Sequence, residues 1–377
     1  MTYTNSRPSF GRLVYLFVFS VIIIGSSLVY FHPSIPKASS FRFQPQITSP
    51  SADGSQQVEA AIPPIVHFVQ LKKDKESTLH FKFEAFLTLY AAYLHVAPTT
   101  IYIHHDFSEK EVADALTHGS SWTKKVLTSF PTVVKLNRVT APTHANGVEI
   151  NAIEHKSDFV RVEQVERFGG IYLDWDVVTL QPLANLRRAG YRAVVGRQFD
   201  AFINNGILLA MPNSAVMRIL DRESRRVFDN GWITHSVALL TRVANTLAAV
   251  PGEVLIMDFK AFSPFSWEQP SVDDLLRRHE GDAVPPPETR SLQESVNVTA
   301  DALWEAKMIA PSRGWLYDFS DVVFLHKFYK WVKAPTGYSG VNVPYILARD
   351  SNYAVATWPI VMEGIKQGLI DAHDETY

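Results

Sequence analysis

Two aspartates, Asp174 and Asp176, stand two residues apart in the stretch GGIYLDWDVV at 169–178. An extended backbone points residues i and i+2 to the same face of a strand. Two carboxylates so close together on an apolar strand repel each other and are costly to desolvate, so a bound cation is the natural compensation. Oxygen ligands favour hard divalent ions. The stretch therefore predicts a metal-cation site, the alternative being an edge strand that ends in solvated aspartates.

A helix is predicted immediately before this stretch. Asn151 is expected to cap it, with Glu154 reaching back from three residues further on in a capping box, and the Gly-Gly pair is expected to end it. Asp158 and Arg161 are one turn apart on this helix and project from nearly the same side. They form either an ordinary ion pair or a donor and acceptor for a polar ligand, and the nearby aspartates favour the second interpretation.

The remaining body of the chain alternates strand and helix patterns. Strands are predicted at 62–70, 100–104, 132–136 and 254–257, helices at 79–96, 122–130, 214–228, 236–249 and 364–370, and a surface insertion at 272–297. This alternation indicates an α/β domain with a mostly parallel sheet that is covered by helices on both faces. Ligands of such sheets bind at the carboxyl ends of the strands.

The composition limits the size of the core, the partners and the kinds of site that the chain can have. The 377 residues are 46% hydrophobic and 20% charged, enough for one substantial core or two. A net charge of −2 gives no polybasic footprint, so nucleic acid is not expected as a partner. The chain has no cysteine, which excludes disulfides, zinc–thiolate sites and a cysteine nucleophile.

The amino-terminal part predicts attachment to a membrane. Residues 13–31 are apolar or small and uncharged, and about 19 residues at 1.5 Å each nearly cross a hydrocarbon layer of about 30 Å. Arg7 and Arg12 precede this signal-anchor segment, so residues 1–12 are expected to be a cytoplasmic tail. Residues 32–61, rich in Pro, Ser and Gln, are expected to form a stem, and residues 62–377 a lumenal domain. The alternative is a signal peptide cleaved near 25–27.

Several segments together resemble a known family. HKSDFVR at 155–161, followed by FGGIYLDWDV at 168–177, resembles the DXD-region signature of glycosyltransferase family 32, which includes eukaryotic Golgi mannosyl- and galactosyltransferases. IPPIVH at 62–67 is similar to the opening strand of that family, and NNGILLAMP at 204–212 to its strand beside the sugar site. The resemblance is sharp over about residues 62–212 and vague beyond.

The resemblance implies a GT-A-like, Rossmann-type domain after one transmembrane helix, in a single-pass type II protein of the Golgi membrane. The implied reaction moves a hexose, with retention of configuration, from a nucleotide sugar of the UDP-galactose or GDP-mannose class to a glycan or glycolipid. The implied cofactor is Mn²⁺ or Mg²⁺. The Asn297 sequon is compatible with a lumenal glycoprotein.

Residue by residue, the resemblance implies that Asp158 and Arg161 contact the donor sugar, that Asp174 holds its ribose and sugar side, and that Asp176 ligates the metal. The implied catalytic pair is Asp174 and Asp176; the substrate-binding set is Asp158, Arg161, Tyr172, Asn204, Asn205, His67 and Trp331; and the metal set is Asp176, Asp174 and His326. His326 ends an apolar run at 322–326, where the alternative is a structural histidine. Trp331 departs from the family pattern, because it comes one position early and follows Lys330 in place of serine.

A second function class remains open at this point: a catalytically inactive, membrane-tethered carbohydrate-binding or scaffold protein on a transferase fold. The intact acidic residues favour the enzyme. A metal-dependent phosphohydrolase is less favoured, because the sequence lacks the additional ligands of a two-metal centre.

Overall fold

The computed structural model describes residues 61–286, 299–308, 312–328 and 332–377. The predicted tail at 1–12, the transmembrane anchor at 13–31, nearly all of the stem and Asn297 lie outside these ranges. Among the helices of the described residues, none combines the length and the hydropathy needed to cross a membrane.

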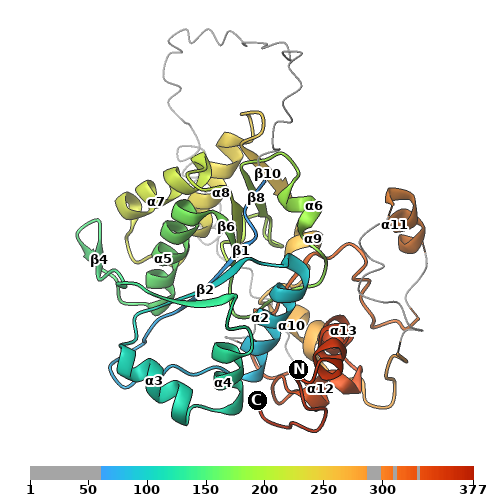
Figure 1. The fold of residues 1–377 in the computed structure, drawn as a ribbon. Helices are drawn as coiled ribbons and strands as arrows, with labels where there is room; N and C mark the ends of the chain where they lie inside the picture. The colour runs from blue at the N-terminus through green and yellow to red at the C-terminus, as the bar shows by residue number, and fades with distance from the viewer. Residues whose placement is uncertain (1–60, 287–298, 309–311, 329–331) are drawn as a thin grey trace, which may run out of the picture. The chain divides into compact units, whose positions relative to one another are not determined.

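The central sheet contains seven strands in the order β10-β8-β9-β6-β1-β2-β3. Their bounds are β1 Ile65–Gln70, β2 Thr100–His105, β3 Val134–Arg138, β6 Gly170–Leu173, β8 Ala193–Gly196, β9 Ile207–Ala210 and β10 Val254–Met257. Every neighbouring pair is parallel except those that β9 makes with β6 and β8. The mostly parallel sheet expected from the sequence is therefore confirmed, with one antiparallel strand inserted (Figure 1).

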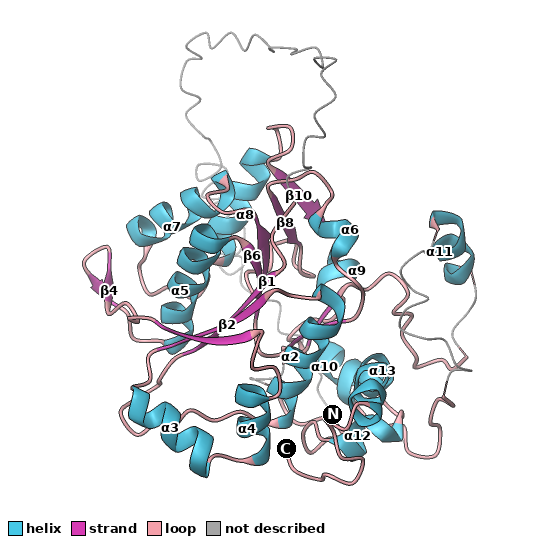
Figure 2. Ribbon diagram, in the orientation of Figure 1, coloured by secondary structure: helices cyan, strands magenta, loops and turns pink. Residues whose placement is uncertain are grey.

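Helices cover both faces of this sheet (Figure 2). Along β6, Ile171 and Leu173 pack into one core cluster and Tyr172 into the other, as the period of a strand requires. The first cluster includes residues of α2 Phe83–Val96, α4 Ser121–Thr128, α10 Gln269–Leu276, α12 Val343–Ala348 and α13 Asn352–Lys366. The second includes residues of α5 Ile153–Phe168, α7 Ala215–Val227 and α8 Val237–Leu247.

Shorter elements connect this framework. They are α3 Glu109–His118, α6 Ala184–Arg187, α9 Phe259–Phe262, α11 Ala300–Lys307, β4 His144–Ala145, β5 Val148–Glu149, β7 Val177–Thr179 and β11 Phe324–His326. The predicted capping box at Asn151 is wrong: α5 begins after Ala152, which has no side chain able to cap it. A capping box is present instead at α3, between Ser108 and Glu111.

Two other boundaries differ from the sequence prediction. The surface insertion expected at 272–297 begins inside α10, whose Val272, Leu275 and Leu276 are buried. The helix expected at 364–370 overlaps only the end of the longer α13, which finishes at Lys366 and accommodates Pro359 in its interior. In both places a helix continues across the predicted boundary.

The Gly169-Gly170 pair joins α5 directly to the central strand β6. Both residues have a positive φ, +64° and +109°. A Cβ atom on Gly170 would lie 2.4 Å from the carbonyl oxygen of Ile65, so a larger residue would push β6 away from β1. Because the turn is this tight, residues of α5 come close to the residues that follow β6.

His67 stabilises this turn through a hydrogen bond to Gly169. Its Nε2 lies 2.8 Å from the carbonyl oxygen of Gly169, and its Nδ1 lies 2.9 Å from Nε2 of His104. Nδ1 of His104 in turn lies 2.8 Å from Nδ2 of Asn137. His67 is fully buried, with both ring nitrogens occupied. This corrects its predicted role in substrate binding, because the side chain has no surface to offer a ligand.

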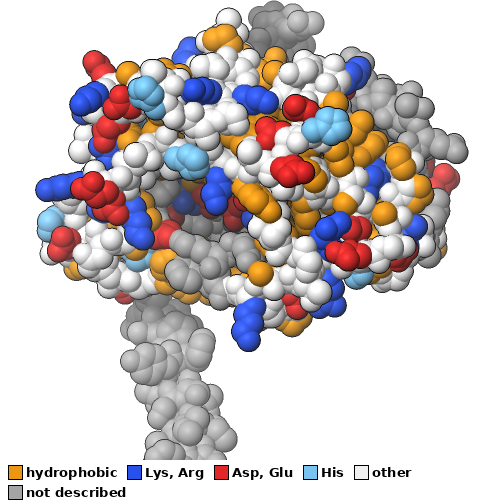
Figure 3. Space-filling model, turned by 90° about the horizontal axis from the view of Figure 1, so that it is seen from below, with side chains coloured by type: hydrophobic (Ala, Val, Ile, Leu, Met, Phe, Trp, Pro, Cys, Tyr) orange, Lys and Arg blue, Asp and Glu red, His pale blue; other side chains and the backbone are white. Residues whose placement is uncertain are grey.

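Charged side chains of both signs are intermixed on the face shown in Figure 3, where a hollow opens. The net formal charge of the whole chain is −2. Such a surface provides little long-range attraction for a polyanion. The charged groups of a ligand must therefore be met by individual side chains inside a site.

The buried histidine pair makes stability depend on pH. Burial lowers the pKa of His67 to about 4, against the opposing effect of its hydrogen bond to Gly169. Burial and the neighbouring His67 also lower the pKa of His104. The unfolded chain then binds more protons than the folded one below pH ~6.5. We expect the free energy of unfolding to fall between pH ~6.5 and ~4, by up to ~1.4 kcal/mol per pH unit for each histidine.

Urea unfolding of the full chain across this range tests the expectation. His104→Gln should show a shallower pH dependence than the wild type, since one titrating group is gone. His118→Gln, which removes an exposed histidine of α3, is the matched control. Equal slopes in the wild type and His104→Gln would contradict this account.

Candidate active site

The two aspartates lie just beyond the carboxyl end of β6, at the edge of the sheet where ligands of parallel sheets bind. The chain then turns into β7, which pairs antiparallel with β11 so that His326 stands opposite Val177. This pairing places Nε2 of His326 3.2 Å from Oδ1 of Asp176. The backbone N–H of Lys327 donates to the carbonyl oxygen of Asp176 at 3.1 Å. A residue 150 positions along the chain from Asp176 thus completes the site.

Trp175, between the aspartates, faces the opposite way. Its ring stacks on Phe68 with 4.3 Å between centroids, and its Nε1–H donates to the carbonyl oxygen of Val69 at 3.0 Å. The indole is therefore fixed against the core. This arrangement leaves the carboxylates of Asp174 and Asp176 on the side away from the core, partly open to solvent, at 27% and 35% side-chain exposure.

Asp174, Asp176 and His326 form a candidate metal centre. One ligand atom from each lies within 4.8 Å of the others, and no other such group of three occurs in the described part of the chain. Two carboxylates and an imidazole suit a divalent ion. Burial raises the pKa of Asp176, but His326 and Lys327 outweigh it and lower the pKa to about 2. Asp176 is therefore an anion at neutral pH, as a metal ligand must be.

Asn204 controls the state of the imidazole. Its Oδ1 accepts from the N–H of Gly206 at 2.7 Å, so its Nδ2 faces both Oγ of Ser263 and Nδ1 of His326, at 2.8 and 2.9 Å. A neutral His326 that accepts at Nδ1 carries its proton on Nε2 and donates toward Asp176. The two carboxylates can ligate a metal directly, whereas His326 joins them through Nε2 only after the amide of Asn204 turns.

A second cluster adjoins the first. Nη2 of Arg161 lies 3.2 Å from Oδ1 of Asp174 and 3.4 Å from Oδ1 of Asp158, and Nη1 donates to the carbonyl oxygen of Asn205 at 2.9 Å. The hydroxyl of Tyr172 donates to Oδ1 of Asp174 at 2.5 Å. The guanidinium also lies over the Tyr172 ring, 4.5 Å from its centroid. The two candidate pairs identified in the sequence are thus one connected network.

Asp158 is held on every side. Its Oδ1 accepts from Nδ2 of Asn205 at 2.9 Å, and Oδ2 lies 3.2 Å from Nε2 of His235. The ring of His235 is fully buried and stacks on Phe159 at 5.2 Å. This fixes the direction in which the carboxylate can accept hydrogen bonds.

The structure therefore brings together most of the predicted residues, namely Asp158, Arg161, Tyr172, Asp174, Asp176, Asn204, Asn205 and His326. Tyr172 and Arg161 are nearly buried, and both contact the carboxylate of Asp174. His67 lies outside the network, and Trp331 and Lys330 fall outside the described residues. Lys327 does not face solvent: its Nζ lies 2.6 Å from Oε1 of Glu84.

Sequence reasoning missed His235 and Gly206. His235 is 77 residues from Asp158, and no local pattern marks it. Gly206 follows the Asn-Asn pair, and that context was the available signal. A Cβ atom there would lie 2.5 Å from Oδ2 of Asp174 and 2.9 Å from Cε1 of His326, so only glycine leaves room for both.

Comparison with known proteins finds one matching family model. Residues 77–192 match the family model described as the glycosyltransferase sugar-binding region containing a DXD motif. Glucan organizing enzyme 1 of Cryptococcus neoformans var. grubii is 27% identical over 233 residues, which cover 58% of this chain and 58% of that relative. The chain thus matches less than two thirds of the relative's length.

Two solved structures are similar in part. PaToxG glycosyltransferase matches with 13% identity and a TM-score of 0.35, over 51% of this chain and 70% of that one. The apo form of the glycosyltransferase GlyE of Streptococcus pneumoniae TIGR4 matches with 10% identity and a TM-score of 0.40, over 84% and 64%.

Crowding at Gly206 gives a direct test of the metal centre. Gly206→Ala should displace Asp174 or His326 and weaken Mn²⁺ binding, measured by calorimetry with UDP or GDP present, at least tenfold. Gly314→Ala is the matched control, because a Cβ atom there meets nothing within 4 Å. Unchanged Mn²⁺ affinity in a folded Gly206→Ala variant would show that the ion binds elsewhere.

Proposed function

We propose that this chain transfers a hexose from a nucleotide sugar to a glycan or glycolipid. The premise is that it is a glycosyltransferase with a DXD sugar-binding region at residues 77–192. The proposed donor belongs to the UDP-galactose or GDP-mannose class, and the transfer retains anomeric configuration with the help of Mn²⁺ or Mg²⁺. The mixed α/β sheet with its acidic pair at the carboxyl edge supports a GT-A-type domain.

One observation carries this proposal: the carboxylates of Asp174 and Asp176 converge with His326 beside the Asp158–Arg161 pair. A divalent ion bound there would neutralise the charge that develops on a leaving nucleoside diphosphate. The chain's own residues must then orient the sugar. Asp174 is suited to accept from sugar or ribose hydroxyls, because Tyr172 and Arg161 already fix its carboxylate.

A cavity of about 240 Å³ opens beside Asp176 and supports placing one ring of the donor's nucleotide there, the base or the ribose. It is lined by Gln70, His80, Phe81, Lys82, Glu84, Ala85, Trp175 and Asp176. Its aromatic and polar lining matches what a base and a ribose require. In this arrangement the Nε2–H of His326 is the donor available to a phosphate oxygen next to Asp176.

The state of Asp158 favours a front-face substitution. A double displacement would need a free carboxylate at the anomeric carbon, whereas Asp158 is engaged by Asn205, Arg161 and His235. In the proposed step the bond between the anomeric carbon and the diphosphate oxygen breaks, and the acceptor oxygen bonds to the same face. The acceptor hydroxyl proton passes to the departing diphosphate.

The proposal also includes a Golgi location with residues 13–31 as a type II membrane anchor and the catalytic domain in the lumen. It is supported by the length and hydropathy of that segment in the sequence. Protease protection of the body of the chain in sealed membranes would test this orientation.

Asp176→Asn should decrease Mn²⁺-dependent release of UDP from UDP-galactose, or of GDP from GDP-mannose, by about 100-fold or more, because a ligand and a charge are lost together. The measurement is nucleotide release by the full chain in detergent, with an oligosaccharide acceptor. Asp114→Asn, an exposed aspartate of α3, is the matched control.

If the wild type neither releases nucleotide nor gains thermal stability with any UDP- or GDP-sugar and Mn²⁺, the proposed reaction fails. Equal activity of Asp176→Asn and wild type would remove Asp176 from the mechanism. The sugars of both donor classes are α-linked, so a β-linked product would contradict retention.

A further inference from the structure

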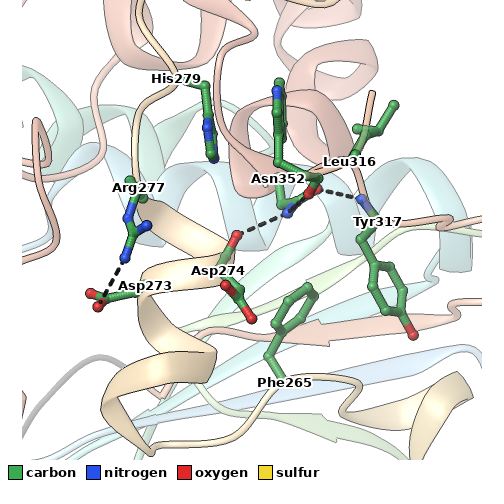
Figure 4. A pocket seen from close by; sticks show the side chains of 10 residues that line it. Phe265, Asp273, Asp274, Arg277, His279, Leu316, Tyr317 and Asn352 are labelled. Atoms are coloured by element: carbon green, nitrogen blue, oxygen red, sulfur yellow. Dashed lines mark hydrogen bonds and ion pairs between the residues drawn. The ribbon is translucent and has the colours of Figure 1, made fainter. Parts of the chain in front are cut away.

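A second cavity, of about 270 Å³, lies between α10, residues 314–317 and the start of α13 (Figure 4). Its walls include the aromatic rings of Phe265, Trp315 and Tyr317 and the side chains of Asp274 and His279. The proposed donor site is built from other residues, around Asp174 and Asp176. This cavity is therefore distinct from the proposed donor site.

The aromatic walls are rigid. The rings of His279 and Trp315 stack with 4.3 Å between centroids and an angle of 5° between planes. Nε1–H of Trp315 donates to Oδ2 of Asp282 at 2.8 Å, which fixes the indole. The rings of Phe265 and Tyr317 pack against each other at 5.1 Å. Fixed rings bind the apolar face of a ligand with little loss of side-chain entropy.

The polar groups divide into occupied and free ones. Asn352 is fully used: its Nδ2 donates to the carbonyl oxygens of Asp274 and Trp315 at 2.8 and 2.9 Å, and its Oδ1 accepts from the N–H of Tyr317 at 2.7 Å. Asp273 forms an ion pair with Arg277 at 3.3 Å. Figure 4 shows both sets of contacts, while the carboxylate of Asp274 has no partner among the residues drawn.

This combination selects the chemistry of the ligand. A free carboxylate accepts hydroxyl hydrogen bonds, and aromatic rings accept an apolar face, so the cavity matches a polyhydroxylated ring. A phosphate or other anion is disfavoured, because the carboxylate of Asp274 has no ion-pair partner among the described residues and Arg277 is already paired with Asp273. Ligand pockets for drug-sized molecules begin near ~300 Å³, so this volume fits a smaller ligand, such as one pyranose unit.

One wall of the cavity lies close to the candidate metal centre along the chain. Ser263 Oγ accepts from Asn204, which also contacts His326, and Phe265 in the cavity wall is two residues further along the chain. Two residues span at most ~7 Å of extended chain. The separation is therefore short enough for a glycan of a few sugars to span.

We propose that this cavity binds one neutral hexose of the acceptor glycan, with Asp274 as its hydrogen-bond acceptor and the rings of Phe265 and Trp315 as its apolar walls. The inference rests on the proposed function, since it identifies the acceptor as a carbohydrate chain. It assigns to residues outside the DXD region the task of choosing the acceptor.

The test uses methyl α-mannoside and methyl β-galactoside as probes, followed by saturation-transfer NMR on the full chain without metal or nucleotide. We expect at least one glycoside to bind the wild type, and Asp274→Ala to weaken that binding at least tenfold. Asp274→Asn should have an intermediate effect. Asp114→Ala, which removes an exposed aspartate from α3, should leave binding unchanged.

Thermal denaturation shows whether each variant is folded; Asp274 is exposed, so neither substitution should matter to the core. Binding of neither glycoside to the wild type, or equal binding by wild type and Asp274→Ala, would overturn the inference. Asp176→Asn separates the two proposals: it should lose Mn²⁺-dependent nucleotide release but keep glycoside binding. Glycoside binding without any nucleotide-sugar activity would support the sugar-binding cavity and contradict the proposed reaction.

Discussion

The site depends on holding two aspartate carboxylates together at the end of a buried strand against their mutual repulsion. Asp174 is offset by the guanidinium of Arg161 and by the hydroxyl of Tyr172, both nearly buried. Asp176 is offset by His326 and by the charge of Lys327. The repulsion is therefore reduced without a metal, but each carboxylate remains partly exposed. Arg161, which compensates Asp174, comes from α5, and His326, which compensates Asp176, comes from β11. Elements from both faces of the sheet therefore supply the groups that offset the two carboxylates.

Local sequence rules predicted the parts of this arrangement that lie close together along the chain. The i, i+2 spacing placed Asp174 and Asp176 on one face, and the Gly-Gly pair correctly ended α5. Strands β1 and β2 followed from short runs of β-branched and aromatic residues, as did the overall alternation of strand and helix. The antiparallel direction of β9 was not predictable, because an isolated apolar strand carries no signal of its direction. It follows from the connection that β9 makes within the sheet.

The errors at His67 and His235 have a common physical origin, namely contacts between segments that are distant along the chain. His67 was assigned to substrate because it ends a motif of the resembling family, yet its neighbour His104 and the carbonyl oxygen of Gly169 occupy it fully. His235 was missed for the same reason, since its role exists only once α5 and the segment before α8 are packed together. A residue type specifies what a side chain can bind, whereas the fold decides which of its partners are already taken.

The same reasoning applies to His326 and sharpens its role. Distance alone makes it a third metal ligand, but the N–H of Gly206 fixes the amide of Asn204, and that amide donates to Nδ1 of the imidazole. Nε2 then carries the proton and points at Asp176. In this state the imidazole acts as a donor that steadies an anion, either Asp176 or a phosphate beside it. Ligation by Nε2 needs the amide to rotate, at the cost of the hydrogen bond from Gly206. The choice between the two states thus lies with Asn204, a buried residue held between Ser263 and His326.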